Sequence, residues 1–150
     1  MLGKTMCVCE AIVQVLRQNP IAKVLVCAPS DAACDVLASR LLPLLPKTNV
    51  QPPTGRRMLL RINWWSRKLA SLDPSLLTSC SMDPVGAVFT LPTLTEFQAA
   101  SIVVCQCFVA EWLEFCGKRG WTKKHFTHLF IDETSQAMEC ESLVPIFKVN

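Results

Sequence analysis

The feature that most constrains the fold is a short apolar run that ends in two adjacent acids. Residues 129–131 have the β-branched and aromatic character of a strand buried on both faces of a sheet, and Asp132 and Glu133 follow directly. In an open α/β sheet, ligands bind beyond the carboxyl ends of the strands. Two adjacent carboxylates there repel each other unless they share a cation, which a magnesium–nucleotide site supplies. The run therefore predicts an α/β fold with a nucleotide site at the sheet edge.

A second constraint lies near the amino terminus, where Gly3, Lys4 and Thr5 open an apolar-periodic segment. Gly-Lys-Thr at the start of a helix is the second half of a phosphate-binding P-loop. In that motif the glycine lets the backbone approach a phosphate, the lysine reaches the β- and γ-phosphates, and the threonine hydroxyl holds magnesium. The first glycine of the pattern would precede Met1, so Gly-Lys-Thr alone is a weak indication of a P-loop. Together with the acid pair it is a stronger indication of a nucleotide site.

The bulk properties fit one domain of a soluble intracellular protein. The 150 residues suffice for a sizeable core, and no apolar run approaches the roughly 18 to 20 residues of a membrane helix. Glu10 interrupts the first apolar stretch, so we expect no signal peptide. The nine cysteines are expected to be reduced thiols, and their two Cys-x-Cys pairs lack zinc-site spacing. A net charge of +3 permits an anionic partner without requiring one.

Periodicity along the chain predicts alternating helices and strands, which is typical of a parallel sheet. The helix that begins at Phe108 should turn Trp112, Leu113 and Cys116 inward. We expect helices at 5–18, 31–42, 108–119 and 137–146, strands at 23–28, 56–62, 101–105 and 127–131, and an irregular insertion at about 71–98.

Two surface features remain open to two interpretations each. Trp64 and Trp65 are followed by cations at 67–68, so they could stack on bases while the cations meet phosphates. The alternative, which is the more common arrangement of such side chains, is that they cover an edge of the core while the cations are solvated. The basic residues within 118–125 form a rim that is either a nucleic-acid contact or an ordinary charged loop.

Four segments resemble, in order and spacing, the first RecA-like lobe of superfamily 1 RNA helicases. The resemblance is to their Moloney-leukaemia-virus-ten/Armitage branch, relatives of the nonsense-mediated-decay helicase. The segments are Gly3-Lys4-Thr5, Ala28-Pro29-Ser30-Asp31, His125 to Glu133, and Glu139-x-Glu141-Ser142-Leu143-Val144. The resemblance implies a P-loop NTPase fold of the RecA-like type, a mostly parallel sheet flanked by helices and incomplete at both ends, as one partial lobe over residues 1–150.

The resemblance implies ATP and Mg²⁺ as cofactors and assigns residues to them by position. Phosphoryl transfer depends on positioning and on charge neutralisation, which suits a lysine, a hydroxyl and two acids. By this correspondence the nucleotide contacts are Gly3, Lys4, Thr5 and Gln136, the magnesium ligands are Thr5 and Asp132, and the catalytic groups are Lys4, Asp132 and Glu133, with Glu133 activating water.

The resemblance also implies an RNA partner. Members of the family move 5′ to 3′ along single-stranded RNA in cytoplasmic silencing and decay granules, and their RNA-contacting segment corresponds to Ala28, Pro29 and Ser30. The implied partners are single-stranded RNA and silencing or decay proteins, with no membrane. The implied location is the cytoplasm, including ribonucleoprotein granules.

Several departures from the family pattern limit what the chain should do alone. Its acid motif reads Asp-Glu-Thr-Ser instead of Asp-Glu-Ala-Gly, and Cys105-Gln106-Cys107 replaces a Thr-Thr-containing segment. The first half of the P-loop and the second lobe with its arginine finger are missing, and loss of the finger alone costs about 10³- to 10⁵-fold in rate. We therefore expect no unwinding by the isolated chain.

The alternative is a degenerate paralogue that serves as an RNA- or protein-binding scaffold without ATP hydrolysis. The base-specificity signatures of P-loop GTPases and kinases are not visible.

Overall fold

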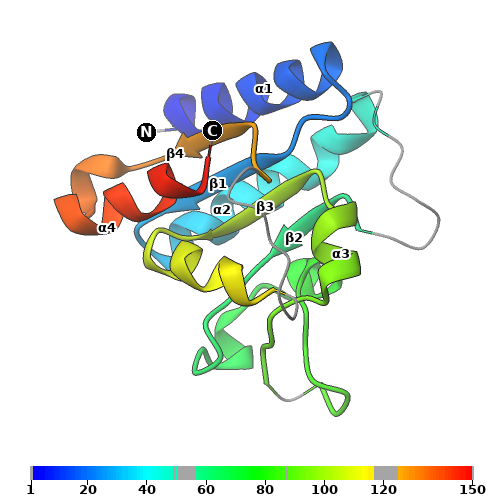
Figure 1. Cartoon of the computed structure of the whole chain (residues 1–150), viewed down its shortest axis with the longest axis vertical. Coiled ribbons are helices and arrows are strands. Elements are labelled where there is room, and N and C mark those ends of the chain that lie inside the picture. Colours follow the sequence, from blue (N-terminus) through cyan, green and yellow to red (C-terminus); the bar gives the residue numbers. More distant parts are fainter. Residues whose placement is uncertain (1, 49, 51–56, 87, 117–124, 150) are drawn as a thin grey trace.

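The computed structural model describes residues 2–48, 50, 57–86, 88–116 and 125–149. A four-stranded sheet with the order β2-β3-β1-β4 lies at its centre (Figure 1). All three strand pairs are parallel. The strands are β1 (Val24–Ala28), β2 (Leu59–Arg61), β3 (Ile102–Gln106) and β4 (His128–Ile131). The predicted α/β fold with a parallel sheet flanked by helices is confirmed.

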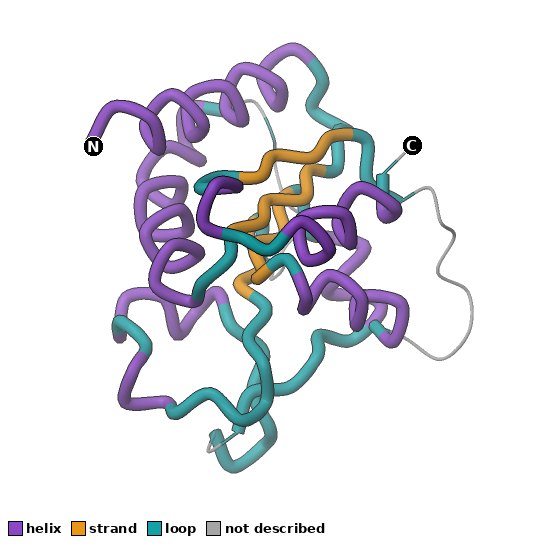
Figure 2. Tube along the Cα trace, turned by 90° about the vertical axis from the view of Figure 1, so that its left-hand side faces the viewer, coloured by secondary structure: helices purple, strands orange, loops and turns teal. Residues whose placement is uncertain are grey.

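Helices cover both faces of this sheet, as the side view in Figure 2 shows. The first face carries α1 (Leu2–Gln18) and α2 (Asp31–Leu41), and the opposite face carries α3 (Leu94–Ala99) and η4 (Phe108–Phe115). The remaining helical segments are η1 (Leu42–Lys47), η2 (Leu69–Ser71), η3 (Pro74–Ser79), η5 (Thr134–Gln136), α4 (Glu139–Leu143) and η6 (Val144–Lys148).

The central strand β1 shows why the apolar runs become strands. Its side chains alternate between two cores, with Val24 and Val26 in the cluster under α1 and α2 and with Leu25 and Cys27 in the opposite cluster. All five residues are buried, as expected of a parallel strand covered by helices on both faces. In register, Val24 lies between Ile102 of β3 and His128 of β4.

Several of the expected elements differ from the structure. The helix expected at 137–146 is the short helix α4 at 139–143, followed by the 3₁₀ segment η6. The run 129–131 is not buried on both faces, because β4 lies at the end of the strand order and its residues are only half-buried. The strand expected at 56–62 is shorter, at 59–61, and all its side chains are buried. The helix expected at 108–119 is the 3₁₀ segment η4, and it leaves Trp112 37% exposed instead of inward.

The region 71–98 has the irregular character that its proline-marked turns predict. Between η3 and α3 it contains only isolated bridges among the described residues, including Arg61 with Cys80 and Met82 with Phe89. Thr93 caps α3 in a reciprocal capping box with Glu96. The basic residues at 118–124 lie outside the described residues, so their predicted role is not tested.

The nine cysteines are free thiols. Seven are buried, while Cys7 and Cys140 are exposed. Burial raises the pKa of Cys34 to about 12 and that of Cys9 to about 11, although Arg40 acts in the opposite direction on Cys9. Cys34 and Cys9 are therefore neutral, and the buried cysteines serve as small apolar side chains. Within the described residues, every helix falls short of the length and apolar character that a bilayer crossing requires.

Candidate functional site

The carboxyl ends of the four parallel strands meet at one edge of the sheet, and the predicted site residues gather there. Asp132 follows the last residue of β4, and Thr5 lies in the first turns of α1. The Thr5 hydroxyl donates a hydrogen bond to Oδ2 of Asp132 over 3.0 Å, although 127 positions separate them. The two predicted magnesium ligands are thus adjacent in space.

The carboxylate of Asp132 is held in one orientation. Its backbone N–H donates to the carbonyl oxygen of Cys27 at 2.9 Å, which continues the pairing of β4 with β1. Its second side-chain oxygen, Oδ1, accepts the backbone N–H of Glu133 at 3.0 Å. Both oxygens therefore have fixed partners, and the group is oriented before any ligand arrives.

Glu133 adopts a backbone conformation that is unusual for its residue type. Its φ of 54° and ψ of 34° place it in the left-handed region, which costs a non-glycine residue roughly 1 to 2 kcal/mol. Its carbonyl oxygen accepts the N–H of Gln136 at 2.9 Å, and this bond closes the turn of η5. Its side chain is exposed. Backbone strain of this kind is often found at functional sites.

A pocket of about 300 Å³ opens at this edge. It is lined by Lys4 and Thr5 from α1 and by residues 131–136 after β4, so it brings Gln136 together with the acid pair. Gly3 borders open space, since an added Cβ would meet nothing within 4 Å. Packing therefore does not require glycine there, and room for a close phosphate would explain it.

The donor set fits a magnesium ion that is shared with phosphates. Mg²⁺ prefers hard oxygen ligands and is commonly bound by one or two protein oxygens with phosphates and water. Thr5 and Asp132 provide one hydroxyl and one carboxylate. Among the described residues, no three His, Cys, Asp or Glu side chains gather into an all-protein metal site. These residues therefore suit a nucleotide-bridged ion better than a permanent metal centre.

The predicted RNA-contacting segment adjoins this site. A second pocket of about 250 Å³ is lined by Thr5, Asp132 and Glu133 on one side and by Ser30 with the first turns of α2 on the other. Ser30 caps α2 by accepting the N–H of Ala33 at 3.2 Å. Ala28 is fully buried and its carbonyl oxygen accepts the Cys107 N–H at 3.1 Å, so the accessible part of the segment is the half-buried Pro29 and the exposed Ser30.

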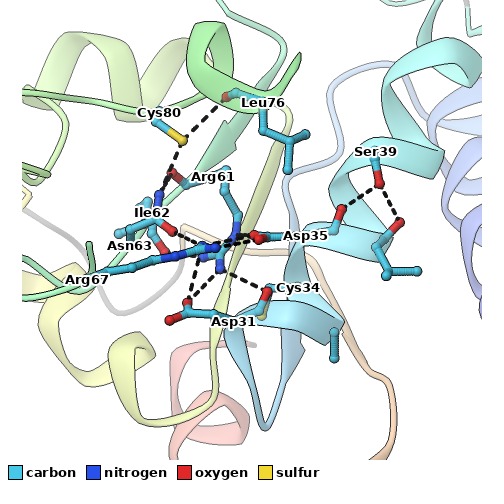
Figure 3. Close-up of polar contacts among 12 residues, drawn as sticks. Asp31, Cys34, Asp35, Ser39, Arg61, Ile62, Asn63, Arg67, Leu76 and Cys80 are labelled. Carbon is cyan, nitrogen blue, oxygen red and sulfur yellow. Dashed lines mark hydrogen bonds and ion pairs between the residues drawn. The ribbon is translucent and has the colours of Figure 1, made fainter. Parts of the chain in front are cut away.

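A buried ion-pair cluster, which sequence reasoning missed, supports the same end of α2 (Figure 3). The Arg61 side chain is fully buried and donates to Asp35 at 3.0 Å and to Asp31 at 2.7 Å. Arg67 donates to Asp35 at 3.0 Å and to Asn63 at 2.6 Å. The available signal was a single cation, Arg61, inside the apolar run 58–62, because a charge in a buried strand requires a partner.

Comparison with known proteins agrees with this architecture. Residues 2–68 match the model of a family described as an AAA domain. The chain is 31% identical over 144 residues to the putative helicase MOV-10 of Gallus gallus and 28% identical over 144 residues to the putative helicase mov-10-B.2 of Danio rerio. Both alignments cover 96% of this chain but only 14% and 13% of the respective relatives.

Another relative is the probable helicase with zinc finger domain of Homo sapiens, which is 26% identical over 96% of this chain and 7% of its own length. The chain thus spans a small part of each of these relatives, and each alignment is 144 residues long.

Proposed function

We propose that this chain, which is related to the superfamily 1 helicases of the MOV-10 type, is part of the nucleotide-binding lobe of an ATP-dependent RNA helicase. The observation that carries the proposal is the hydrogen bond from Thr5 to Asp132. It joins the two motifs on which a magnesium–nucleotide site depends, one at each end of the sequence. In domain terms, we propose that residues 1–150 form one partial RecA-like lobe.

In the proposed site each side chain has one task. Bound magnesium–ATP would supply the transferable γ-phosphoryl group and a divalent charge. Lys4, exposed on the pocket wall, neutralises phosphate charge, and Thr5 and Asp132 provide oxygens to the metal. Glu133 extends its free carboxylate from the turn after Asp132, where it orients and deprotonates an attacking water. Gln136 on the same wall contacts the nucleotide, and Gly3 leaves room for a phosphate.

The RNA part of the proposal rests on the second pocket. Thr5, Asp132 and Glu133 line both the nucleotide pocket and the pocket that contains Ser30. Binding or hydrolysis of the nucleotide would therefore change the shape of the Ser30 pocket. Pro29 and Ser30 would contact the backbone of single-stranded RNA, while Ala28, which is buried and whose carbonyl oxygen is hydrogen-bonded to Cys107, would position them. The proposal also includes movement along RNA in the 5′ to 3′ direction. It further includes a role in RNA silencing or decay together with proteins of those pathways, and a location in cytoplasmic granules.

Nucleotide binding by the purified chain tests the proposal. We would titrate a fluorescent ATP analogue in the presence and absence of Mg²⁺, with the Asp132→Asn variant alongside. We expect Mg²⁺-dependent binding that Asp132→Asn weakens about tenfold or more, since one charged ligand is worth about 1.5 to 3 kcal/mol. Glu10→Gln, an exposed acid on the same helix α1, is the matched control and should bind as the parent does.

The scaffold alternative gives a different pattern. It predicts no Mg²⁺-dependent nucleotide binding, together with salt-dependent binding of single-stranded RNA. RNA affinity would then be indifferent to Glu133→Gln. That combination of results would replace the helicase assignment with the scaffold assignment.

A further inference from the structure

We propose that the aromatic pocket formed by Trp64, Trp65 and Trp112 is a stacking subsite for one unpaired RNA base. The inference deepens the proposed function, because it depends on the chain binding single-stranded RNA. It assigns a second contact surface, separate from Pro29 and Ser30, to a part of the chain that the nucleotide site does not use.

The three indoles form one cluster. The rings of Trp64 and Trp65 are stacked, with centroids 3.7 Å apart and an interplanar angle of 28°. Trp112 meets both of them edge-on, at centroid distances of 5.2 Å and 5.7 Å. They surround a pocket of about 310 Å³, whose other walls are Asn63, Phe89, Thr90, Leu91 and Val109. The tryptophans do cover an edge of the core, but they also leave an apolar hollow.

The outer rings remain accessible. Trp65 is 53% exposed and Trp112 is 37% exposed. A single exposed apolar side chain needs no explanation, but a contiguous aromatic patch beside a pocket can mark a binding site. The three indoles all line the same pocket and contact one another, so an entering base would meet an aromatic surface.

The pocket lies on the side of the molecule where RNA contacts are proposed. Trp64 follows the carboxyl end of β2 by three residues, and η4, which carries Trp112, begins just after β3 ends. Pro29 follows the carboxyl end of the adjacent strand β1. Since the strands are parallel, all three segments leave the sheet at the same edge. A strand of RNA that contacts Pro29 and Ser30 can continue along this edge to the indoles.

The pocket is held in place before any ligand binds. Arg67, two residues after Trp65, pairs with Asp35 on α2 and donates to Asn63 at 2.6 Å. Asn63, which lines the pocket, donates in turn to the sulfur of Cys80 at 3.2 Å. The segment 63–67 is thereby tied to α2, as Figure 3 shows for Asn63 and Arg67. Preorganisation of this kind reduces the entropic cost of binding.

These ties also determine what kind of ligand fits. Arg67 is occupied by Asp35 and the Asn63 amide by Cys80 and Arg67, so neither group is directed at a phosphate or a base edge. Recognition would therefore depend on stacking, which tolerates every base. The volume is at the lower end of the about 300 to 1,000 Å³ of ligand pockets. It accommodates one planar ring system and is too small for several residues of a peptide.

The test is binding of a labelled single-stranded RNA of mixed sequence to this chain, measured by fluorescence anisotropy at several salt concentrations. Trp65→Leu keeps an apolar cover but removes the flat ring, and Trp65→Phe keeps a ring. We expect Trp65→Leu to weaken binding about five- to one-hundredfold and Trp65→Phe to weaken it less. The slope of affinity against salt should not change, because stacking releases no counterions. Unlabelled RNA should quench the tryptophan fluorescence of the parent chain.

The control is Phe147→Ala, which removes an aromatic side chain that is 75% exposed on η6 and does not line the pocket. It should bind RNA as the parent does. If the parent binds RNA and Trp65→Leu binds it equally well, the stacking subsite is wrong while the RNA part of the proposed function survives. If the parent binds no RNA at all, both the stacking subsite and the RNA part of the proposed function are wrong. Circular dichroism of each variant verifies that the fold is retained.

Discussion

The hydroxyl of Thr5 and the carboxylate of Asp132 are hydrogen-bonded over 3.0 Å at the carboxyl edge of the sheet. One group belongs to the first turns of α1 and the other follows the half-buried edge strand β4. Helix and strand are thereby joined at the point where a phosphate-bound cation would lie. The contact links the fold to the proposed chemistry, and its removal should affect both.

Thr5→Val should lower the free energy of unfolding by about 1 kcal/mol, because it removes a partly buried hydrogen bond without a large change in shape. Urea denaturation measures this loss. Thr5→Ser retains the hydroxyl and is the matched control. Equal stabilities for the two variants would mean that the hydrogen bond contributes nothing.

Glu133→Gly should stabilise the chain by up to about 1 kcal/mol, since glycine adopts the left-handed conformation without strain but loses more entropy on folding. Glu133→Ala removes the same carboxylate and keeps the strain, so it should unfold at nearly the same temperature as the parent. Thermal melts of the three proteins give the comparison. A Glu133→Gly protein that melts below the Glu133→Ala protein would contradict the prediction.

Arg61→Ala should destabilise the fold by about 3 kcal/mol, the lower end for breaking a buried ion pair, because Asp31 and Asp35 lose their fully buried partner but keep Arg67. Arg61→Lys restores one charge but not the planar fork that reaches Asp31, Asp35 and the Ile62 carbonyl together, so it should recover only part of the loss. The denaturation midpoint in urea measures both. Full recovery by lysine would show that charge alone suffices.

His125 should make the fold sensitive to mild acid. Burial, assisted by the nearby charge of Lys23, lowers the pKa of His125 to about 4. An unfolded histidine binds a proton below about 6.5, so between these two values the unfolded state holds more protons. Stability therefore falls as the pH drops from 7 towards 4, by about 1 kcal/mol by pH 5 once solvent screening of this half-buried ring is allowed for.

The acid sensitivity can be isolated with His125→Phe. Phenylalanine can retain the contacts of the ring with Phe97 and Phe126, which lie at centroid distances of 4.7 Å and 4.9 Å, but it cannot take up a proton. Melting temperatures recorded at pH 7 and pH 5 should differ less in this variant than in the parent. The same pH dependence in both proteins would exclude His125 as the cause.

Ser30 should have separable structural and RNA-binding roles. Ser30→Ala removes the cap of α2 and should cost about 1 kcal/mol. Ser30→Asp keeps a capping oxygen, so its stability should match that of the parent, while its negative charge repels phosphate and should weaken RNA binding. Unfolding and RNA titrations of both variants test this pair of effects. Unchanged RNA affinity in Ser30→Asp would remove Ser30 from the proposed RNA surface.

Much of the architecture and the pairing of Thr5 with Asp132 could be predicted from local patterns. The runs at β1 and β3 contain the buried, β-branched residues of parallel strands, and the Gly-Lys-Thr and Asp-Glu motifs specify hydroxyl and carboxylate positions relative to α1 and β4. Parallel strands end at a common edge, so the meeting of these motifs followed from the strand directions. This was inferable because each signal is carried by residues close in sequence.

Tertiary structure alone decided where those elements lie and which side chains meet across them. An edge position leaves β4 half-buried, although its sequence has the apolar character of a fully covered strand. Arg61 is stable in a buried strand because α2, which lies earlier in the chain, presents both Asp31 and Asp35 to it. Trp112 lies beside Trp64 and Trp65 because β3 and β2 are neighbours. The hydrophobic periodicity of one segment indicates which of its side chains face the core and which face solvent. It does not indicate which side chains of other segments they contact, because those segments are distant in sequence and meet only in the folded structure.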